Sequence, residues 1–272
     1  MSLDAAAGLL ACPHCGGPLA IGEPVACPRG HSFDVARQGY LNLLPAGQPK
    51  NADTTDMLGA RARVLSSGAF DRILNLVAEH SRRAPRVLEV GAGTAQYLRQ
   101  ALGDDPSRRG VALDVSVAAA RAAAKADSRI ASIVADVWSP LPLLDNCFDA
   151  VLCVFAPRNL AEFARVLTPE GRLLVLVPNP GHLQRLRQRY GLLGIEADKQ
   201  ERLTAAAGEF FEQTVKSRML HAVEFSGELA RDVIAMGPNA FHEPPVPTEP
   251  VADHLDVTLY VFEPLPAAGD LR

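Results

Sequence analysis

The sequence predicts an α/β protein with a mostly parallel β-sheet that carries helices on both faces. From Arg86 to Val177 the chain alternates between short apolar runs and segments with helical spacing, which is the pattern of buried parallel strands joined by crossover helices. The first of these apolar runs ends in a glycine turn, Gly91-Ala92-Gly93, that leads directly into a helical segment. A strand, a tight turn and a helix N-terminus together form a corner at which nucleotide-like ligands bind.

Composition limits the classes of protein that need to be considered. The chain has 272 residues, enough for one or two domains, and its 48% hydrophobic and 21% charged content is ordinary for a globular protein. A net charge of −4 means that any contact with nucleic acid must use a local basic patch. No apolar run is long enough to span a membrane and no basic residues precede the apolar segment Ala5–Ala11, so we expect a cytoplasmic protein with no membrane partner.

The N-terminal region predicts a metal site. Cys12 and Cys15 form a C-x2-C pair, and after eleven residues Cys27 and His31 form a C-x3-H pair. Three thiolates and one imidazole in two such knuckles are a ligand set that structural Zn²⁺ prefers, with all four positions filled by protein. His14 lies between the first two cysteines, where the chain must turn, and is the competing candidate ligand.

The segment after this region predicts a connection followed by two helices. Residues 45–56 are rich in Gly, Pro, Lys, Asn and Asp and have no periodic pattern, so they are predicted to be a linker or a ligand-gating loop. Apolar residues with helical spacing predict helices over Asp56–Ser67 and Phe70–His80. Arg61 in the first of these helices is either a solvated charge or a cation that reaches an anionic ligand.

The remaining elements follow from apolar periodicity, capping residues and glycine or proline stops. Cys147 and Cys153 lie in or beside an apolar strand and are expected to be small core residues. The predicted order is a strand ending at Val90, a helix capped by Thr94, a strand Gly110–Asp114, a helix from Ser116 to about Ala126, a strand Ile130–Ala135, a strand Phe148–Phe155, a helix Asn159–Leu167, a strand Arg172–Val177, a helix from Glu201, a strand Phe211–Phe225, a helix Ser226–Met236 and a strand His254–Glu263.

Acidic residues at the ends of the first three strands indicate the kind of ligand. Glu89, Asp114 and Asp136 occupy these places. Asp114 stands where a carboxylate accepts hydrogen bonds from both ribose hydroxyls, and Asp136 stands where a side chain can meet an adenine edge. A dinucleotide fingerprint would need glycine in place of Gln96, and a phosphate loop would need a G-K-[ST] sequence that is absent. The pattern therefore favours an adenosine pocket for a ligand that carries a sulfonium and an amino acid.

These motifs resemble those of the class I S-adenosylmethionine-dependent methyltransferases over the C-terminal four-fifths of the chain. Ala95 is a departure, because many members have a third glycine there. The matching segments, in the order of the family's motifs, are Arg86–Ala95, Leu113-Asp114, Ala135-Asp136, Phe148–Val151 and Leu167–Gly171.

The N-terminal segments narrow the resemblance further. CPHC at Cys12–Cys15 and CPRGHSFDVARQGYLNLLP at Cys27–Pro45 are similar to the RlmA-type large-subunit ribosomal RNA (guanine-N1)-methyltransferases. That group includes the macrolide-resistance enzymes of antibiotic-producing actinomycetes. The segments DTTDM at Asp53–Met57 and FAPRN at Phe155–Asn159 favour that branch.

The resemblance implies a Rossmann-like sheet with a final antiparallel strand, S-adenosylmethionine as cofactor, one structural Zn²⁺ and large-subunit ribosomal RNA as partner. It divides the chain into a zinc-binding RNA-recognition domain (1–44), the linker or gating loop (45–56) and a methyltransferase domain (57–272). The residues expected to contact the cofactor are Glu89, Gly91, Ala92, Gly93, Thr94, Asp114, Val115, Asp136, Val137 and Phe155.

Methylation of guanine N1 sets its own requirements. N1 carries a proton at neutral pH and lies on the Watson–Crick edge, so the base must be unpaired, must be held in line with the sulfonium methyl and must lose that proton. This predicts a hairpin loop or otherwise distorted RNA as substrate. Phe155 or Pro157 is expected to pack on the base and His182 to relay the proton, the alternative for His182 being a histidine near a helix N-terminus without a catalytic task.

A basic segment predicts where RNA is gripped. His182, Arg185 and Arg189 have the spacing of one helix face, with Arg187 nearby, although a solvated face is the alternative explanation. Phe241 stands where family members have an aromatic residue, often Trp. The basic residues that the N-terminal region adds are Arg29, Arg37 and Lys50.

Two other classes of function stay open at this point. The protein could methylate a small molecule and use zinc only for stability, or it could be a non-catalytic RNA-binding module that retains the pocket. A homodimer, which would widen a basic cleft for a large RNA, also stays open.

Overall fold

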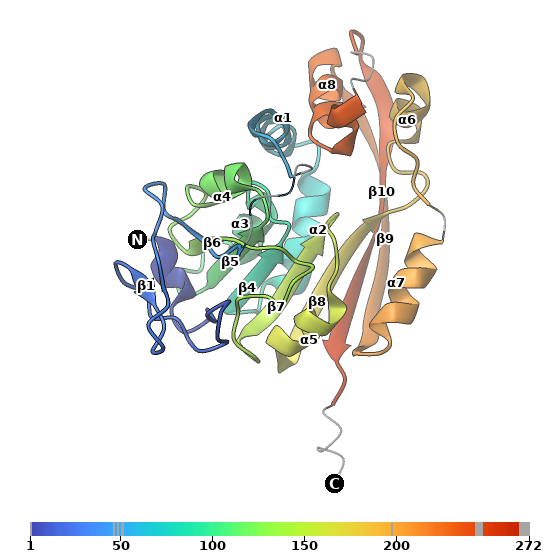
Figure 1. Cartoon of the computed structure of the whole chain (residues 1–272). Coiled ribbons are helices and arrows are strands. Elements are labelled where there is room, and N and C mark those ends of the chain that lie inside the picture. The colour runs from blue at the N-terminus through green and yellow to red at the C-terminus, as the bar shows by residue number, and fades with distance from the viewer. Residues whose placement is uncertain are drawn as a thin grey trace.

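A single eight-stranded sheet forms the centre of the protein (Figure 1). The computed structural model describes residues 2–45, 47, 49, 52–196, 198–242 and 247–266, so Lys50 and part of the predicted linker lie outside the described residues. The strands lie in the order β3-β6-β5-β4-β7-β8-β10-β9. Their bounds are β3 (Tyr40–Asn42), β4 (Arg86–Val90), β5 (Arg109–Asp114), β6 (Ile130–Val134), β7 (Phe148–Val154), β8 (Leu167–Pro178), β9 (Phe211–Phe225) and β10 (Val251–Pro264).

The sheet is parallel from β3 to β8 and antiparallel beyond it. β10 pairs antiparallel with both β8 and β9, while the pairs among β3 to β8 are parallel. The predicted class, a mostly parallel sheet with a final antiparallel strand, is therefore confirmed. The central strands are buried on both faces, which is why their sequences are nearly continuous apolar runs.

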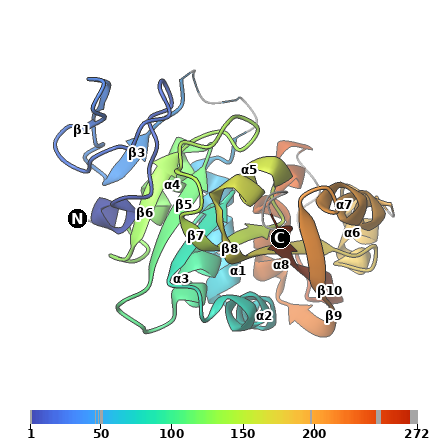
Figure 2. The same ribbon diagram turned by 90° about the horizontal axis from the view of Figure 1, so that it is seen from below.

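The helices and two short 3-10 helices cover both faces of this sheet (Figures 1 and 2). No helix within the described residues is long and apolar enough to cross a membrane. Their bounds are η1 (Ser2–Ala6), α1 (Thr55–Ser66), α2 (Asp71–Ser81), α3 (Gln96–Leu102), α4 (Val117–Ala123), α5 (Leu160–Val166), α6 (Gln184–Tyr190), α7 (Lys199–Ala207), α8 (Gly227–Ala235) and η2 (Pro238–His242).

Two hydrophobic cores lie on opposite faces of the sheet. Leu88 and Val90 of β4 pack in the same core as η1, α5 and α7. Val87, which precedes Leu88 and points to the opposite face, packs in the core that contains α2, α3 and α8. Because successive side chains of a strand point to opposite faces, one apolar run supplies both cores.

The N-terminal zinc region is joined to the main sheet. Its own hairpin consists of β1 (Val25–Ala26) and β2 (Ser32–Phe33), which pair antiparallel. Tyr40–Asn42 then continues as β3, which pairs parallel with β6, and Figure 2 shows this region beside the β6 end of the sheet. Leu10 and Leu19 of the region share a core with the central strands. The region and the sheet therefore pack as one body.

Some predicted boundaries are wrong, for local reasons. Thr94 does not cap α3: Ala95 occupies the N-cap position with a left-handed backbone (φ 57°), and Thr94 Oγ1 instead donates a hydrogen bond to Gln96 Oε1 (2.7 Å). α4 ends at Ala123, because the next residues form tighter turns in which Ala126 N–H donates to the Ala123 carbonyl (3.0 Å). The predicted cap Ser116 is confirmed, since its side chain accepts the N–H of Ala119. Asn159 and Ser226, the first residues of two predicted helices, cap α5 and α8 in the same way.

The two isolated cysteines are core residues, as predicted. Cys147 and Cys153 are buried and unpaired. Burial raises the pKa of the Cys147 thiol to about 11 and that of the Cys153 thiol to about 12. Both side chains are therefore neutral at physiological pH and are poor nucleophiles.

Candidate functional site

A cavity of about 760 Å³ lies at the carboxyl ends of the parallel strands. It is lined by Glu89 and Gly91 at the end of β4, Asp114 at the end of β5, Asp136 after β6 and Phe155 after β7. The carboxyl ends of parallel strands meet at one edge of a sheet, and ligands of open α/β sheets bind outside that edge. The cavity is thus where the sequence predicts the ligand to bind.

The two glycines of the turn at the centre of this edge have little room for a side chain. Gly91 and Gly93 have positive φ angles, 62° and 54°. A Cβ atom on Gly91 would lie 2.7 Å from the Cβ of Ala156, and one on Gly93 would lie 2.6 Å from Nη1 of Arg61. Close packing against Ala156 therefore favours glycine at Gly91, and the positive φ angle favours it at both positions.

The three acidic residues at the strand ends are held by backbone N–H groups. Asp114 accepts hydrogen bonds from Gly93 N–H and Ser116 N–H, both at 2.8 Å. Asp136 accepts one from Trp138 N–H (3.0 Å), and Glu89 accepts one from the N–H of Leu98 in α3 (3.1 Å). Each carboxylate keeps lone pairs free for a ligand.

Burial shifts the ionisation of two of these acids. It raises the pKa of Asp114, and it raises the pKa of the fully buried Glu89 to about 8. A cationic group bound nearby would oppose both shifts, because an adjacent positive charge favours the ionised carboxylate. The strand ends are therefore suited to a ligand that carries positive charge.

The expected cofactor residues line the cavity together, apart from Gly93. That glycine faces Arg61 and contributes its N–H to Asp114. Thr94 lines the cavity although it does not cap α3. The expected cofactor residues that line the cavity are Glu89, Gly91, Ala92, Thr94, Asp114, Val115, Asp136, Val137 and Phe155.

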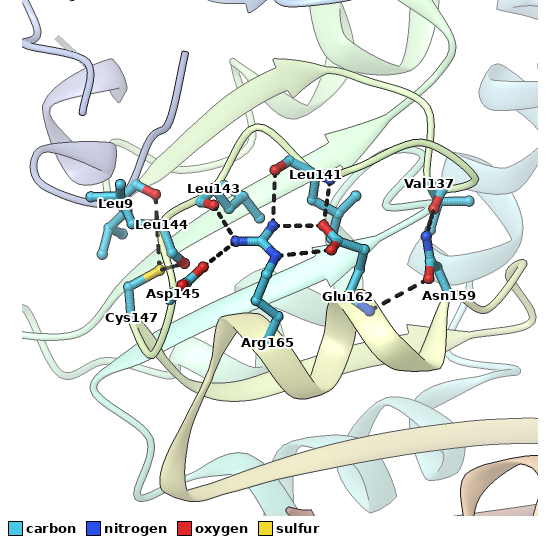
Figure 3. A network of polar contacts seen from close by, with 10 residues as sticks. All are labelled: Leu9, Val137, Leu141, Leu143, Leu144, Asp145, Cys147, Asn159, Glu162 and Arg165. Carbon is cyan, nitrogen blue, oxygen red and sulfur yellow. Dashed lines mark hydrogen bonds and ion pairs between the residues drawn. The ribbon is translucent and has the colours of Figure 1, made fainter. Parts of the chain in front are cut away.

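The loop after β6, which carries Asp136, Val137 and Trp138, is fixed from below by a polar network (Figure 3). Arg165 of α5 donates to the Leu143 carbonyl (2.8 Å) and the Leu141 carbonyl (3.0 Å) and pairs with Glu162 (2.6 Å). Asn159 donates to the Val137 carbonyl (2.9 Å). This side of the cavity is therefore held in place by α5 and its N-cap residue Asn159.

Arg61 is the cation of the cofactor half. Its Nη1 lies 2.6 Å from Asp53 Oδ2, and its Nη2 donates to the Met236 carbonyl (2.7 Å). Among the described residues that line the cavity, Arg61 and Arg187 carry positive charge. The sequence allowed two interpretations of Arg61, a solvated charge or a cation that contacts an anionic ligand. The structure places its guanidinium against the glycine turn.

The four predicted zinc ligands lie together in the N-terminal region. Their donor atoms are all within 4.8 Å of one another. His31 Nδ1 lies 3.4 Å from Cys27 Sγ and 3.5 Å from Cys12 Sγ, and Cys15 Sγ lies 3.7 Å from Cys27 Sγ. Sulfurs about 2.3 Å from a tetrahedral Zn²⁺ lie roughly 3.8 Å apart, so the donor set fits a structural zinc ion.

The competing ligand, His14, has a different place. Its ring stacks on Phe33, with ring centroids 5.7 Å apart and an interplanar angle of 13°. His14 lies outside the cluster of four donor atoms. It therefore packs against the hairpin beside the zinc site.

The second half of the cavity brings the predicted catalytic residues together. Phe155, Pro157 and His182 all line it, and the rings of Phe155 and His182 lie 5.8 Å apart. Phe155 has a left-handed backbone (φ 53°), which is uncommon for a large side chain. Its ring is 43% exposed at the cavity mouth.

The predicted basic helix face is wrong in part. Leu183 has a left-handed backbone (φ 49°) and α6 begins after it, so His182 precedes the helix and is buried. Arg185 and Arg189 are exposed on α6, as predicted, but Arg189 pairs with Glu249 (2.8 Å). Helical spacing alone could not show where the helix begins.

The other predicted RNA contacts lie on the zinc region. Arg29 and Arg37 are exposed there and do not line the cavity. The zinc region adjoins the β3 and β6 end of the sheet, whereas α6 packs on β10 near the other end (Figure 1). The two basic sets therefore flank the sheet from opposite ends.

We expect the change Cys27→Ser to reduce the zinc content from one ion per chain to none and to lower the melting temperature of the whole protein. The region shares a core with the sheet, so losing the metal loosens more than the region itself. Zinc content by mass spectrometry and a thermal melt measure this. The buried non-ligand change Cys147→Ser serves as control, and full zinc content in Cys27→Ser would contradict the assignment.

We expect Arg61→Ala to weaken the binding of S-adenosylmethionine, because Arg61 is the cation beside the glycine turn and can pair with the carboxylate of the ligand. Loss of a charge-assisted hydrogen bond corresponds to roughly 10- to 100-fold in Kd. Trp138, the one tryptophan of the sequence, lines the cavity and reports binding by fluorescence.

Arg63→Ala is the matched control for Arg61→Ala, because Arg63 lies on the same helix and pairs with Asp232 (2.6 Å) outside the cavity. The decarboxylated cofactor should bind both variants and the unchanged protein almost equally. An undiminished affinity of Arg61→Ala for the complete cofactor would refute the contact.

Comparison with known proteins identifies two matching family models. Residues 10–52 match the N-terminal zinc ribbon of RlmA, and residues 87–171 match a methyltransferase domain. The first match contains the zinc cluster, and the second contains the glycine turn with Asp114 and Asp136.

Curated relatives match most of the chain. A 23S rRNA (guanine(748)-N(1))-methyltransferase of Streptomyces fradiae is 40% identical over 243 residues, covering 87% of each chain. A putative 23S rRNA (guanine-N(1)-)-methyltransferase of Micromonospora griseorubida is 39% identical and covers 87% of this chain and 88% of its own. A putative enzyme of the same description from Bacillus subtilis is 34% identical over 65% of this chain and 67% of its own. The chain belongs to the RlmA-type 23S rRNA (guanine-N1)-methyltransferases.

Proposed function

We propose that this protein transfers the methyl group of S-adenosylmethionine to N1 of an unpaired guanine in 23S ribosomal RNA. The cofactor supplies an electrophilic methyl group on its sulfonium. The observation that carries the proposal is the continuation of the cavity beyond the glycine turn. There it forms a second half between the loop after β7, the start of α6 and η2. A base in this half would lie next to the cofactor half.

The mouth of the cavity supports a nucleobase as the second ligand. Among the described residues, the exposed large hydrophobic side chains include Trp138 (68%), Phe155 (43%) and Leu193 (48%), and all three line the cavity. Phe241 (46%) is exposed in η2, which borders the cavity through Pro238 and Asn239. Unpaired RNA bases stack on aromatic side chains of this kind. A small-molecule substrate would not need the zinc region or an aromatic rim.

Within the cofactor half we propose the roles that the motifs imply. Asp114 accepts hydrogen bonds from the ribose hydroxyls, because its two oxygens are oriented by Gly93 and Ser116 and remain open to the cavity. Asp136 and Val137 border the adenine. A non-catalytic module would have no use for these groups around the methyl donor.

In the second half we propose that Phe155 packs on the target guanine, with Pro157 beside it. The backbone of Phe155 is strained, and this conformation places its large ring in the wall of the cavity. A base held between the aromatic ring and the opposite wall has one edge free for attack on the methyl group.

We propose that the RNA crosses the cavity mouth between the zinc region and α6. Arg29 and Arg37 are exposed on one side and Arg185 and Arg189 on the other. This arrangement gives the region 1–44 the task of RNA recognition and leaves residues 57–272 to bind the cofactor and the base. A protein of net charge −4 can bind RNA through such local groups of positive charge.

We further propose that the modification confers macrolide resistance, as the DTTDM and FAPRN segments suggest. Expression in a macrolide-sensitive bacterium should produce a strong primer-extension stop at one guanine of 23S rRNA and should raise the inhibitory concentration of a macrolide. Asp114→Ala should abolish both effects. A primer-extension stop without resistance would overturn the resistance role alone. The absence of any stop in the strain that expresses the protein would overturn the methylation itself.

The change Arg185→Ala should weaken RNA binding and reduce the slope of log K against log salt by about 1, because one phosphate contact is lost. Filter binding at several salt concentrations measures this. Arg172→Ala is the control: Arg172 of β8 is also an exposed cation, but it pairs with Glu263 of β10 and does not line the cavity. Equal affinities for the two variants would contradict the proposed RNA path.

A further inference from the structure

His182 is held rigidly by three segments that meet beside the cavity. Its N–H donates to the Asn179 carbonyl (2.9 Å), and its own carbonyl accepts a hydrogen bond from Arg187 Nε (2.9 Å). The N–H of Asp256 in β10 donates to Nδ1 of the imidazole (3.2 Å). The side chain is only 9% exposed. The position and the orientation of the ring are therefore fixed before any substrate binds.

The hydrogen bond from Asp256 also fixes the tautomer. A backbone N–H can only donate, so Nδ1 is the acceptor and the proton of the neutral imidazole is on Nε2. Burial lowers the pKa of His182 to about 4, with Arg187 acting in the same direction and Asp253 and Asp256 opposing it. The imidazole is neutral at physiological pH and presents an Nε2–H group.

The Nε2–H group remains available to a ligand of the cavity that His182 lines. Within the described residues, Nε2 has no hydrogen-bond partner. Every fully buried side-chain nitrogen or oxygen in those residues has such a partner. Nε2 is therefore accessible, and His182 lines the cavity opposite the ring of Phe155. The Nε2–H group is therefore a hydrogen-bond donor available to a ligand in the second half of the cavity.

Among the described residues that line this half, no side chain is basic enough to take up a proton readily at neutral pH. Among the described lining residues that follow Val154 in the sequence, the titratable ones are His182 and Arg187. Arg187 is anchored to the Pro180 and His182 carbonyls and is permanently charged. The carboxylates nearest to His182 are engaged elsewhere: Asp256 pairs with Arg218 (2.8 Å), and Asp253 accepts the Leu186 N–H (2.7 Å). This half thus favours negative charge on its ligand.

We propose that His182 donates its Nε2–H to O6 of the target guanine and so stabilises the negative charge that the base acquires when N1 loses its proton. This inference rests on the proposed function. The N1 proton leaves to solvent water. The electron pair left on N1 forms the bond to the methyl carbon, and the pair of the breaking carbon–sulfur bond stays on sulfur, which becomes a neutral thioether. His182 keeps its proton throughout, so the expectation that it relays the N1 proton is replaced.

This role differs from a purely structural one in its pH dependence. Without an enzyme base, the rate rises with pH until the bound guanine is mostly deprotonated at N1. Removing a donor aimed at O6 makes that deprotonation less favourable, so the plateau moves to higher pH. The loss in kcat at neutral pH should be about 10²- to 10³-fold, the usual effect of removing one such donor.

The test is single-turnover methylation of unmodified 23S rRNA by the complete protein and its variants, from neutral to alkaline pH. His182→Ala should lose activity at neutral pH and recover much of it at high pH. His182→Gln should be rescued in part, because a carboxamide can accept the Asp256 N–H and still donate to O6. His254→Ala should behave like the unchanged protein, since His254 lies on β10 outside the cavity.

Cofactor and RNA affinities of the His182 variants should match those of the unchanged protein, which separates the chemical step from folding and binding. A loss that is equal at every pH and is not rescued by Gln would overturn the donor role, as would an undiminished kcat in His182→Ala. In both cases the unchanged protein would still methylate guanine N1, and the proposed function would stand. Absence of N1-methylguanine with the unchanged protein would overturn both.

Discussion

The carboxylate of Asp114 holds the glycine turn in place, and the rest of the site is arranged around that contact. Asp114 accepts the N–H of Gly93, which ties the end of β5 to the turn that leaves β4. The turn then packs against Ala156 from the loop after β7 and against Arg61 from α1. The approach of Ala156 favours glycine at Gly91, and a positive φ angle favours it at both positions. Asp114, Gly91 and Gly93 thereby shape the part of the cavity where we propose that the cofactor and the guanine meet.

Long-range contacts complete what the turn begins. Arg61 joins Asp53, before α1, to the Met236 carbonyl after α8. Two residues further along α1, Arg63 pairs with Asp232 of α8. Segments far apart in the sequence are thus linked beside the cavity, in which the cofactor half and the second half are adjacent.

Features that depend on local sequence could be predicted, and those that depend on distant partners could not. The strand before Gly91 and the zinc knuckle ligands follow from short-range patterns, because spacing alone decides which residues share a face or a metal. The state of His182 could not be predicted, since its Nδ1 partner is the backbone of Asp256, 74 residues away. The start of α6 was missed for a related reason, because a left-handed Leu183 has no signature in the sequence.

We propose that one cavity holds the methyl donor and the target guanine together, with His182 donating a hydrogen bond to O6 of the guanine. The most direct measurement is a structure of the protein with S-adenosylhomocysteine and a 23S rRNA hairpin. We expect the flipped guanine beside Phe155, N1 facing the cofactor sulfur, and O6 within about 2.7–3.2 Å of His182 Nε2. A guanine bound outside the cavity, or one whose O6 points away from His182, would contradict the account.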